Sequence, residues 1–174
     1  MRWIYFVILA AVGVICQTTL VQVIWLDTPV GWIGPELLAA AAVFFALSAR
    51  GKLDAALAGW ALGFGVELTL SGPGMGLLPL LYAGGCTGLQ YIREAFFRER
   101  ALAQAVLTLL FCAAVYELWT LYDVYLGAGG ALGRRALQAL GLAAYTAVLA
   151  PLVCAGLGRI DRLLLTPAGG RGAR

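Results

Sequence analysis

The fold is decided by residues 50–93, which read RGKLDAALAGWALGFGVELTLSGPGMGLLPLLYAGGCTGLQYIR. Two apolar segments, 53–70 and 75–91, lie between basic residues at either end, and Ser-Gly-Pro-Gly at 71–74 joins them. Proline and glycine supply the backbone geometry of a tight turn. Each apolar segment has the length of a membrane-spanning helix, which needs about 20 residues within a range of about 17–25. The stretch therefore predicts a hairpin of two helices that crosses a membrane and returns.

Four more apolar segments flank this hairpin, at 3–25, 37–49, 101–122 and 137–157. If the six segments are alternating spans that start inside, only Arg134 and Arg135 of the 12 basic residues lie outside. The inner basic residues are Arg2, Arg50, Lys52, Arg93, Arg98, Arg100, Arg159, Arg162, Arg171 and Arg174. Basic residues gather on the cytoplasmic side of membrane proteins. We therefore expect an all-α, polytopic integral membrane protein with six transmembrane helices and with both termini in the cytoplasm.

The composition favours the same class. Hydrophobic residues make up 62% of the chain and charged residues 12%, whereas a soluble domain averages about 45–50% apolar and about 25% charged residues. The net charge of +3 does not indicate nucleic-acid binding, because the basic residues lie at the membrane seams. We expect one transmembrane domain over residues 1–165, in contact with membrane lipid, and a short disordered basic tail at 166–174. The segment 3–25 is too long for the apolar region of a signal peptide, about 15 residues at most, so we interpret it as a retained first span.

The cysteines and the missing histidine limit the chemistry that the chain offers. Each of the four cysteines falls in a different apolar segment, and the sequence contains no CxxC pair and no histidine. Buried cysteines usually act as small hydrophobic residues. Without histidine, the Ser-His pair of many hydrolases and the common zinc sites are excluded. We therefore expect neither a metal nor a cofactor and no enzymatic activity.

Glycines recur at a spacing of four in the hairpin, at Gly59 and Gly63 and again at Gly84 and Gly88. Small residues at this spacing let two helix backbones approach closely within a membrane. We expect the hairpin to be a rigid unit in which Gly63 and Gly84 face protein.

Aromatic residues mark the outer side of the predicted spans. Trp25 ends the first segment and Trp32 follows it, and Tyr116, Trp119, Tyr122 and Tyr125 recur at the end of the fifth. Tryptophan and tyrosine are enriched at the membrane–water interface. We interpret these residues as interfacial, the four on the fifth segment as an aromatic belt.

Acidic residues on the outer half provide the candidate contacts. Glu36, with Pro35 before it, is typical of a helix start. Glu67 lies about 6 Å below the turn at Ser71, and Glu117 lies about 9 Å below Asp123, at about 1.5 Å per residue. An acid within a span is a functional candidate that should face protein rather than lipid. A structural or partner-contact role is our first interpretation of Glu67, Glu117 and Asp123, and ligand or ion binding is the alternative.

The stretch GFGVELTLSGPGMG, at residues 63–76, resembles the signature of the MreD family of rod shape-determining membrane proteins. Gly63, Glu67, Gly72, Pro73 and Gly76 take the motif positions. The length, the six predicted spans, the cytoplasmic termini and the basic connection after the fourth span agree with the family.

The resemblance implies a non-enzymatic scaffold of the bacterial cell-elongation machinery, which directs peptidoglycan synthesis and rod shape. Such a scaffold would lie in the cytoplasmic (inner) membrane and bind an MreC-like protein. RodA, a class B penicillin-binding protein and MreB would belong to the wider complex. The motif glycines, Glu67 and the proline would then serve partner contact or helix packing.

An alternative function remains open. The substrate-binding S component of an energy-coupling-factor vitamin transporter is also a six-span protein of this length, and the MreD family is thought to share its fold. S components capture a vitamin from the outer side, where this chain carries acids, tryptophans and tyrosines. Architecture does not separate these two functions.

Overall fold

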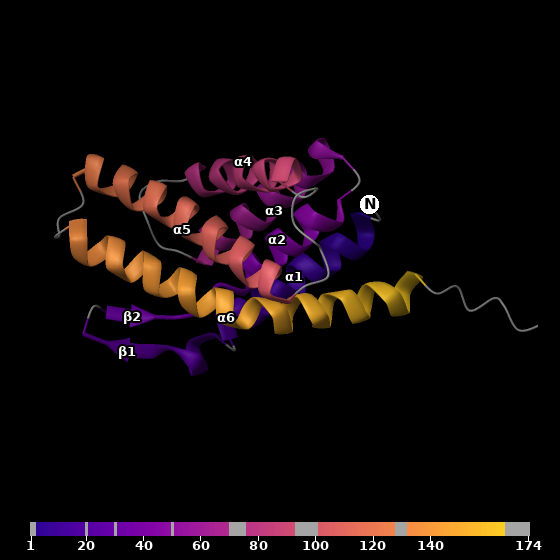
Figure 1. Cartoon of the computed structure of the whole chain (residues 1–174), viewed down its shortest axis with the longest axis horizontal. Helices are drawn as coiled ribbons and strands as arrows, with labels where there is room; N and C mark the ends of the chain where they lie inside the picture. The colour runs from indigo at the N-terminus through magenta and orange to yellow at the C-terminus, as the bar shows by residue number, and fades with distance from the viewer. Residues whose placement is uncertain are drawn as a thin grey trace, which may run out of the picture.

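The structure is a computed structural model, and it describes residues 3–19, 21–29, 31–49, 51–69, 76–92, 101–127 and 132–165. These residues form six α-helices, one short 3-10 helix and one two-stranded hairpin (Figure 1). The elements in order are α1 (Trp3–Thr19), η1 (Val21–Ile24), β1 (Leu26–Thr28), β2 (Gly31–Ile33), α2 (Leu37–Ser48), α3 (Lys52–Thr69), α4 (Leu77–Ile92), α5 (Ala101–Tyr125) and α6 (Leu132–Leu165). The fold is therefore helical, as the apolar segments predict.

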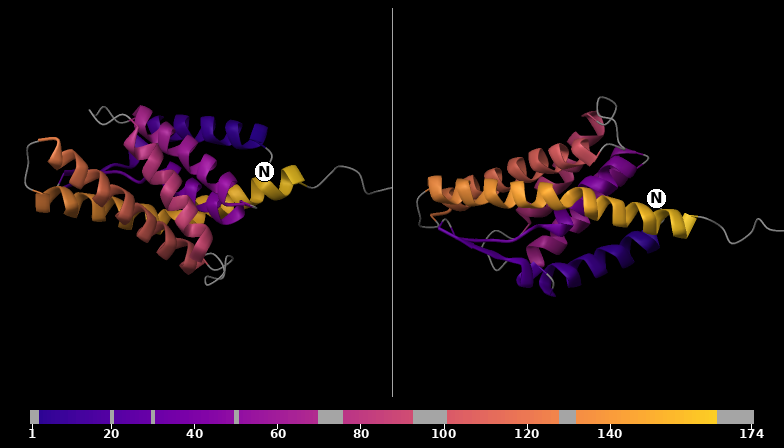
Figure 2. Two further views of the ribbon diagram at one scale, coloured as in Figure 1. Left: turned by 90° about the horizontal axis from the view of Figure 1, so that it is seen from above. Right: turned by 60° about the horizontal axis from the view of Figure 1, so that its bottom comes forward.

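The helices form one bundle in which α1 begins and α6 ends at the same end of the molecule (Figure 1). The helix α3 packs along α4, and α5 packs along α6. The helices α1 and α5 lie on opposite sides of the bundle, with α2 and α3 between them (Figure 2). An even number of crossings along the bundle returns the chain to the end at which it started.

The central helix is α2, which contacts all five other α-helices. Eight of its 12 residues are buried, and the other four, Leu37, Ala41, Phe44 and Ser48, form one partly exposed stripe. A helix that is apolar all round belongs in the interior of a protein. At 12 residues α2 rises only about 18 Å, whereas the hydrocarbon core of a bilayer is about 30 Å thick. Its first turn lies inside the bundle, where Leu38, Ala39 and Ala40 are buried.

Glycine brings α3 and α4 together. A Cβ at Gly63 would lie 2.9 Å from Cα of Pro79 and 3.0 Å from the carbonyl oxygen of Leu78, and one at Gly59 would lie 2.6 Å from the carbonyl oxygen of Tyr82. Only glycine permits this backbone approach. The expectation that Gly84 also faces protein is wrong, because Gly84 is exposed and a Cβ there would meet nothing within 4 Å. The second glycine pair lies on the outer surface of α4.

The first helix is shorter than the segment 3–25 suggests. Thr18 and Thr19 direct their hydroxyls back to carbonyl oxygens of the last turn of α1, and the chain then forms η1 and the hairpin. The strands pair antiparallel, with Leu26 opposite Ile33. The hairpin lies along the first half of α6 (Figure 1), where Ile33 fills the space beside Gly141. Packing against α6 thus holds in place a segment that sequence periodicity does not identify as a hairpin.

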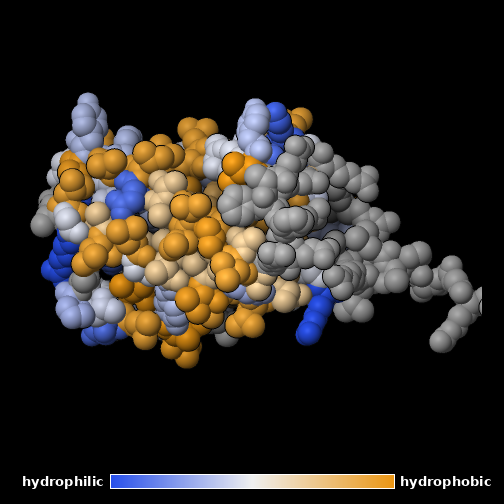
Figure 3. Space-filling view, in the orientation of Figure 1, coloured by the Kyte–Doolittle hydropathy of each residue, from blue (hydrophilic) through white to orange (hydrophobic). Residues whose placement is uncertain are grey.

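Two helices, α5 and α6, are long and apolar enough to cross a membrane, and α1 and α2 are shorter apolar helices. Apolar residues cover the middle of the face in Figure 3, and hydrophilic residues gather at the end where α5 gives way to α6. On α1, seven large hydrophobic side chains are exposed, namely Trp3, Ile4, Tyr5, Val7, Ile8, Val12 and Ile15. An apolar surface of this kind is typical of a protein that contacts lipid.

Candidate functional site: a buried acid at the start of the central helix

Glu36 is the most deeply buried acid that the structure describes. It comes directly before α2, and 6% of its surface is exposed. The hydroxyl of Tyr116 on α5 donates a hydrogen bond of 2.9 Å to Oε2 of the carboxyl. Among the residues that the structure describes, Oε1 has no hydrogen-bond partner. One half of the carboxyl is therefore satisfied and the other half is not.

Tyr82 on α4 extends this cluster. Its hydroxyl lies 3.4 Å from the hydroxyl of Tyr116, and the side chain is completely buried. The ring of Phe111 packs edge-on against Tyr82 with its centroid 5.1 Å away, which keeps the phenol in one orientation. Tyr116 is 6% exposed, so its assignment to an interfacial aromatic belt is wrong. Its hydroxyl finds a partner in the core because Glu36 is there.

The backbone at the start of α2 is held by other helices. Glu36 makes no side-chain cap of its own helix. Its backbone N–H donates to Oγ1 of Thr146 on α6, at 2.9 Å, and the N–H of Leu37 donates to Oε1 of Gln17 on α1, also at 2.9 Å. The first N–H groups of a helix have no partner within it. Side chains of α1 and α6 supply those partners, and Tyr116 of α5 binds the carboxyl. Three helices therefore fix the position of Glu36.

The cluster lies in the half of the bundle that holds the start of α4 and the end of α5. Tyr82 follows Gly76 by about 9 Å along α4, and Tyr116 precedes Tyr125 by about 14 Å along α5, at about 1.5 Å per residue. A carboxyl with two phenols at this depth can bind a proton or a hydrogen-bond donor. A metal site would need more ligands, and the described residues contain no group of three His, Cys, Asp or Glu side chains that could hold a metal ion.

The structure joins two of the motif residues. Oε1 of Glu67, near the end of α3, accepts a hydrogen bond of 2.6 Å from the backbone N–H of Gly76. Gly76 has a φ of +103° just before α4, a conformation that favours glycine. The acid therefore links the end of α3 to the start of α4. Gly72 and Pro73 lie outside the described residues.

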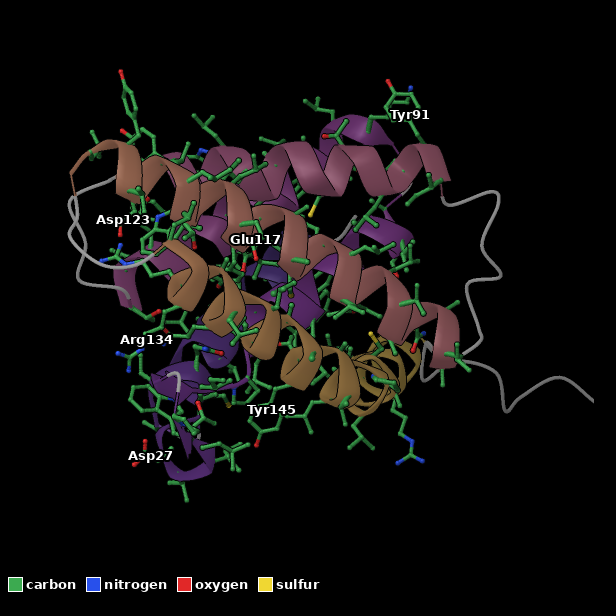
Figure 4. The ribbon with its side chains drawn as sticks, turned by 60° about the vertical axis from the view of Figure 1, so that its left-hand side comes forward. Asp27, Tyr91, Glu117, Asp123, Arg134 and Tyr145 are labelled. Atoms are coloured by element: carbon green, nitrogen blue, oxygen red, sulfur yellow. The ribbon has the colours of Figure 1, made fainter. Side chains whose placement is uncertain are left out.

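The other two candidate acids lie on α5. Asp123 is mostly buried and forms an ion pair with Arg135 of α6, close to the end of the bundle (Figure 4). This pair ties the end of α5 to the start of α6. Glu117 is half-buried on α5, one residue from Tyr116. Asp123 is thus engaged within the chain, and the cluster is built around Glu36 rather than around Glu117.

The hairpin of β1 and β2 is attached to the first half of α6. The hydroxyl of Tyr145 donates to the carbonyl oxygen of Ile24 at 3.1 Å, and Arg134 donates to the carbonyl oxygen of Pro29 at 3.5 Å. Figure 4 shows Tyr145, Arg134 and Asp27 together on this side of the molecule. The hairpin therefore covers α6 near Thr146, which holds the backbone of Glu36.

Sequence reasoning missed Glu36, although a signal was present. The apolar segment 37–49 is shorter than the other segments and too short to cross about 30 Å as a helix. This short length agrees with the burial of Glu36 at the start of the segment.

Comparisons of the chain with protein-family models, with curated proteins and with solved structures give no match.

Proposed function

We propose that this chain is a non-enzymatic membrane scaffold of the bacterial cell-elongation machinery, similar to MreD. In this proposal it crosses the cytoplasmic membrane six times, keeps both termini in the cytoplasm and binds an MreC-like protein. RodA, a class B penicillin-binding protein and MreB belong to the wider complex. Two helices of membrane-spanning length and the position of the basic residues on one side support the membrane topology.

The contact between Glu67 and Gly76 carries the scaffold proposal. Both residues belong to the stretch that resembles the MreD signature, and the hydrogen bond between them shapes the outer end of the α3–α4 hairpin. A hairpin fixed in this way presents a constant surface in the membrane plane, where helices associate through shape and a few polar contacts. Glu67 then acts by positioning the hairpin end for its partner.

Co-purification tests the scaffold proposal. Tagged chain, co-expressed with the MreC-like protein of the same organism, should retain that protein after extraction in mild detergent. Glu67→Ala should weaken retention several-fold because the N–H of Gly76 loses its acceptor, whereas Glu67→Gln keeps an oxygen at that place and should retain the partner. Asp54→Ala, which removes an acid at the other end of α3, is the matched control. The proposal would be rejected if the native chain formed no complex, or if every variant kept the complex.

A vitamin-binding S component is the second candidate, and the buried cluster favours it. An acid with an unsatisfied oxygen in the outer half of a bundle is the kind of group that orients a ligand. A vitamin that bound there would raise the melting temperature by mass action, by about 2.7 kcal/mol of stability at a hundredfold excess over the dissociation constant. In a thermal-shift screen we expect no shift with any vitamin. A saturable shift that Glu36→Gln abolishes would favour the transporter.

A further inference from the structure

We propose that Glu36 is a proton-binding site in the interior of the bundle, with the proton held on Oε1 while Oε2 accepts the hydrogen bond from Tyr116. The proton comes from solvent water and converts the carboxylate into a neutral carboxyl group. No bond other than the O–H bond forms. The site is independent of the scaffold role, because it depends only on the surroundings of the acid.

The first support is the unsatisfied oxygen. Glu36 is 6% exposed, and among the described residues Oε1 has no hydrogen-bond partner. An ionised carboxylate that is buried without a compensating charge is strongly disfavoured, and such a group becomes neutral instead. A proton is also the one ligand that needs no cavity beside the carboxyl.

The second support is where the cations lie. The described basic side chains are engaged or placed elsewhere. Lys52 lies 3.8 Å over the ring of Tyr91, Arg135 pairs with Asp123 and Arg134 reaches the carbonyl oxygen of Pro29. Arg159 is exposed near the far end of α6. None of these contacts neutralises Glu36.

The third support is the set of groups around the carboxyl. The titratable groups that interact with the carboxyl are Tyr82 on α4 and Tyr116 and Cys112 on α5. Each of them is neutral as phenol or thiol at neutral pH. Contacts from α1 and α6 come from Gln17 and Thr146, which do not titrate, and the nearest acid of α3 in the outer half, Glu67, binds Gly76.

Hydrogen bonds also link the carboxyl to two other helices. The hydroxyls of Tyr82 and Tyr116 lie 3.4 Å apart, and Tyr116 donates to Glu36. These three groups come from α4, from α5 and from the start of α2. Loss of the proton would place a negative charge at the point where the three meet, so proton binding stabilises the closed bundle.

Infrared spectroscopy of the protein in lipid bilayers tests the site directly. At neutral pH the native chain should show the carbonyl band of a protonated carboxylic acid, with a shift in heavy water. Glu36→Gln should remove this band, and Glu117→Gln should keep it. A native chain without the band, or a band that survives Glu36→Gln, would overturn the proposal.

Two further measurements apply even if Glu36→Gln does not fold. Tyr116→Phe removes the donor to Oε2 and should move the carbonyl band to higher frequency, whereas the exposed Tyr122→Phe should leave it in place. A glutamate exposed by unfolding is ionised at neutral pH, so the folded state binds the extra proton and its stability falls as pH rises. The melting temperature of the native chain should therefore decrease from mildly acidic to mildly alkaline buffer, and an unmoved band with a level pH profile would reject the site.

Discussion

Single hydrogen bonds between distant helices set the position of Glu36. The N–H of Glu36 lies 110 residues from its acceptor, Thr146, and the N–H of Leu37 is satisfied by Gln17. A buried N–H without a partner costs about 1–3 kcal/mol. Interhelical hydrogen bonds in membrane proteins are worth less on average, about 0.6 kcal/mol. At the residue scale, then, modest energies decide where a potentially charged group lies.

Thr146→Val should destabilise the bundle by about 1 kcal/mol, because the isosteric valine cannot accept the hydrogen bond from Glu36. Thr146→Ser keeps the hydroxyl and should stay within a few tenths of a kcal/mol of the native chain. Unfolding in mixed detergent, followed by tryptophan fluorescence, measures the difference. Equal stability of the valine variant would show that the N–H of Glu36 finds another partner.

At the scale of the helices, glycine positions set how α3 packs on α4, and the length of α2 sets the depth of Glu36. Gly59 and Gly63 face α4 so closely that a Cβ would meet its backbone, whereas Gly84 and Gly88 face outward. The same spacing in two adjacent helices therefore has two different structural consequences. The short length of α2 also matters, because a helix as long as the bundle would place Glu36 at the bundle surface.

Gly63→Leu should lower the yield of folded protein in membranes strongly, since overpacking at a tight helix contact costs about 1–3 kcal/mol or more. Gly84→Leu is the matched test on the other helix, and it should leave the yield unchanged because the new side chain points away from the bundle. Fluorescence-detected size-exclusion chromatography reports both. A tolerated leucine at Gly63 together with a disruptive one at Gly84 would mean that α4 is rotated relative to α3.

The whole molecule combines an apolar exterior with a polar interior cluster. Apolar residues cover much of the visible face (Figure 3), while Glu36, Tyr82 and Tyr116 meet inside. In water the opposite distribution would be expected. The ends differ as well, since the ion pair of Asp123 with Arg135 and the β-hairpin lie at the end where α6 begins.

Cysteine labelling in intact cells tests the orientation of this molecule. On a background in which the four native cysteines are replaced, an impermeant thiol reagent should label Tyr125→Cys but not Gly51→Cys. Both positions are exposed, and they lie at opposite ends of the predicted spans. Permeabilised cells, in which both should react, are the control. Labelling of Gly51→Cys in intact cells would reverse the proposed topology.

The sequence by itself determined the helical class and the approximate positions of the six helices. Long apolar segments favour helices, because a helix satisfies its own backbone groups. Basic residues do not mark every helix end, since Arg134, Arg135 and Arg159 lie within α6. The resemblance of residues 63–76 to the MreD signature also singled out Glu67 and Gly76, but only the structure shows the hydrogen bond between them.

Only the tertiary structure decided which acid is buried and which glycines are packed. Hydrophobic periodicity is weak in segments that are apolar all round, so it does not show which face of α4 meets α3, and Gly84 was placed wrongly for this reason. Glu36 reads as an ordinary helix start, and Tyr116 as an interfacial residue. Their contact joins positions 80 residues apart. It forms because α2 begins inside the bundle and α5 passes beside the start of α2.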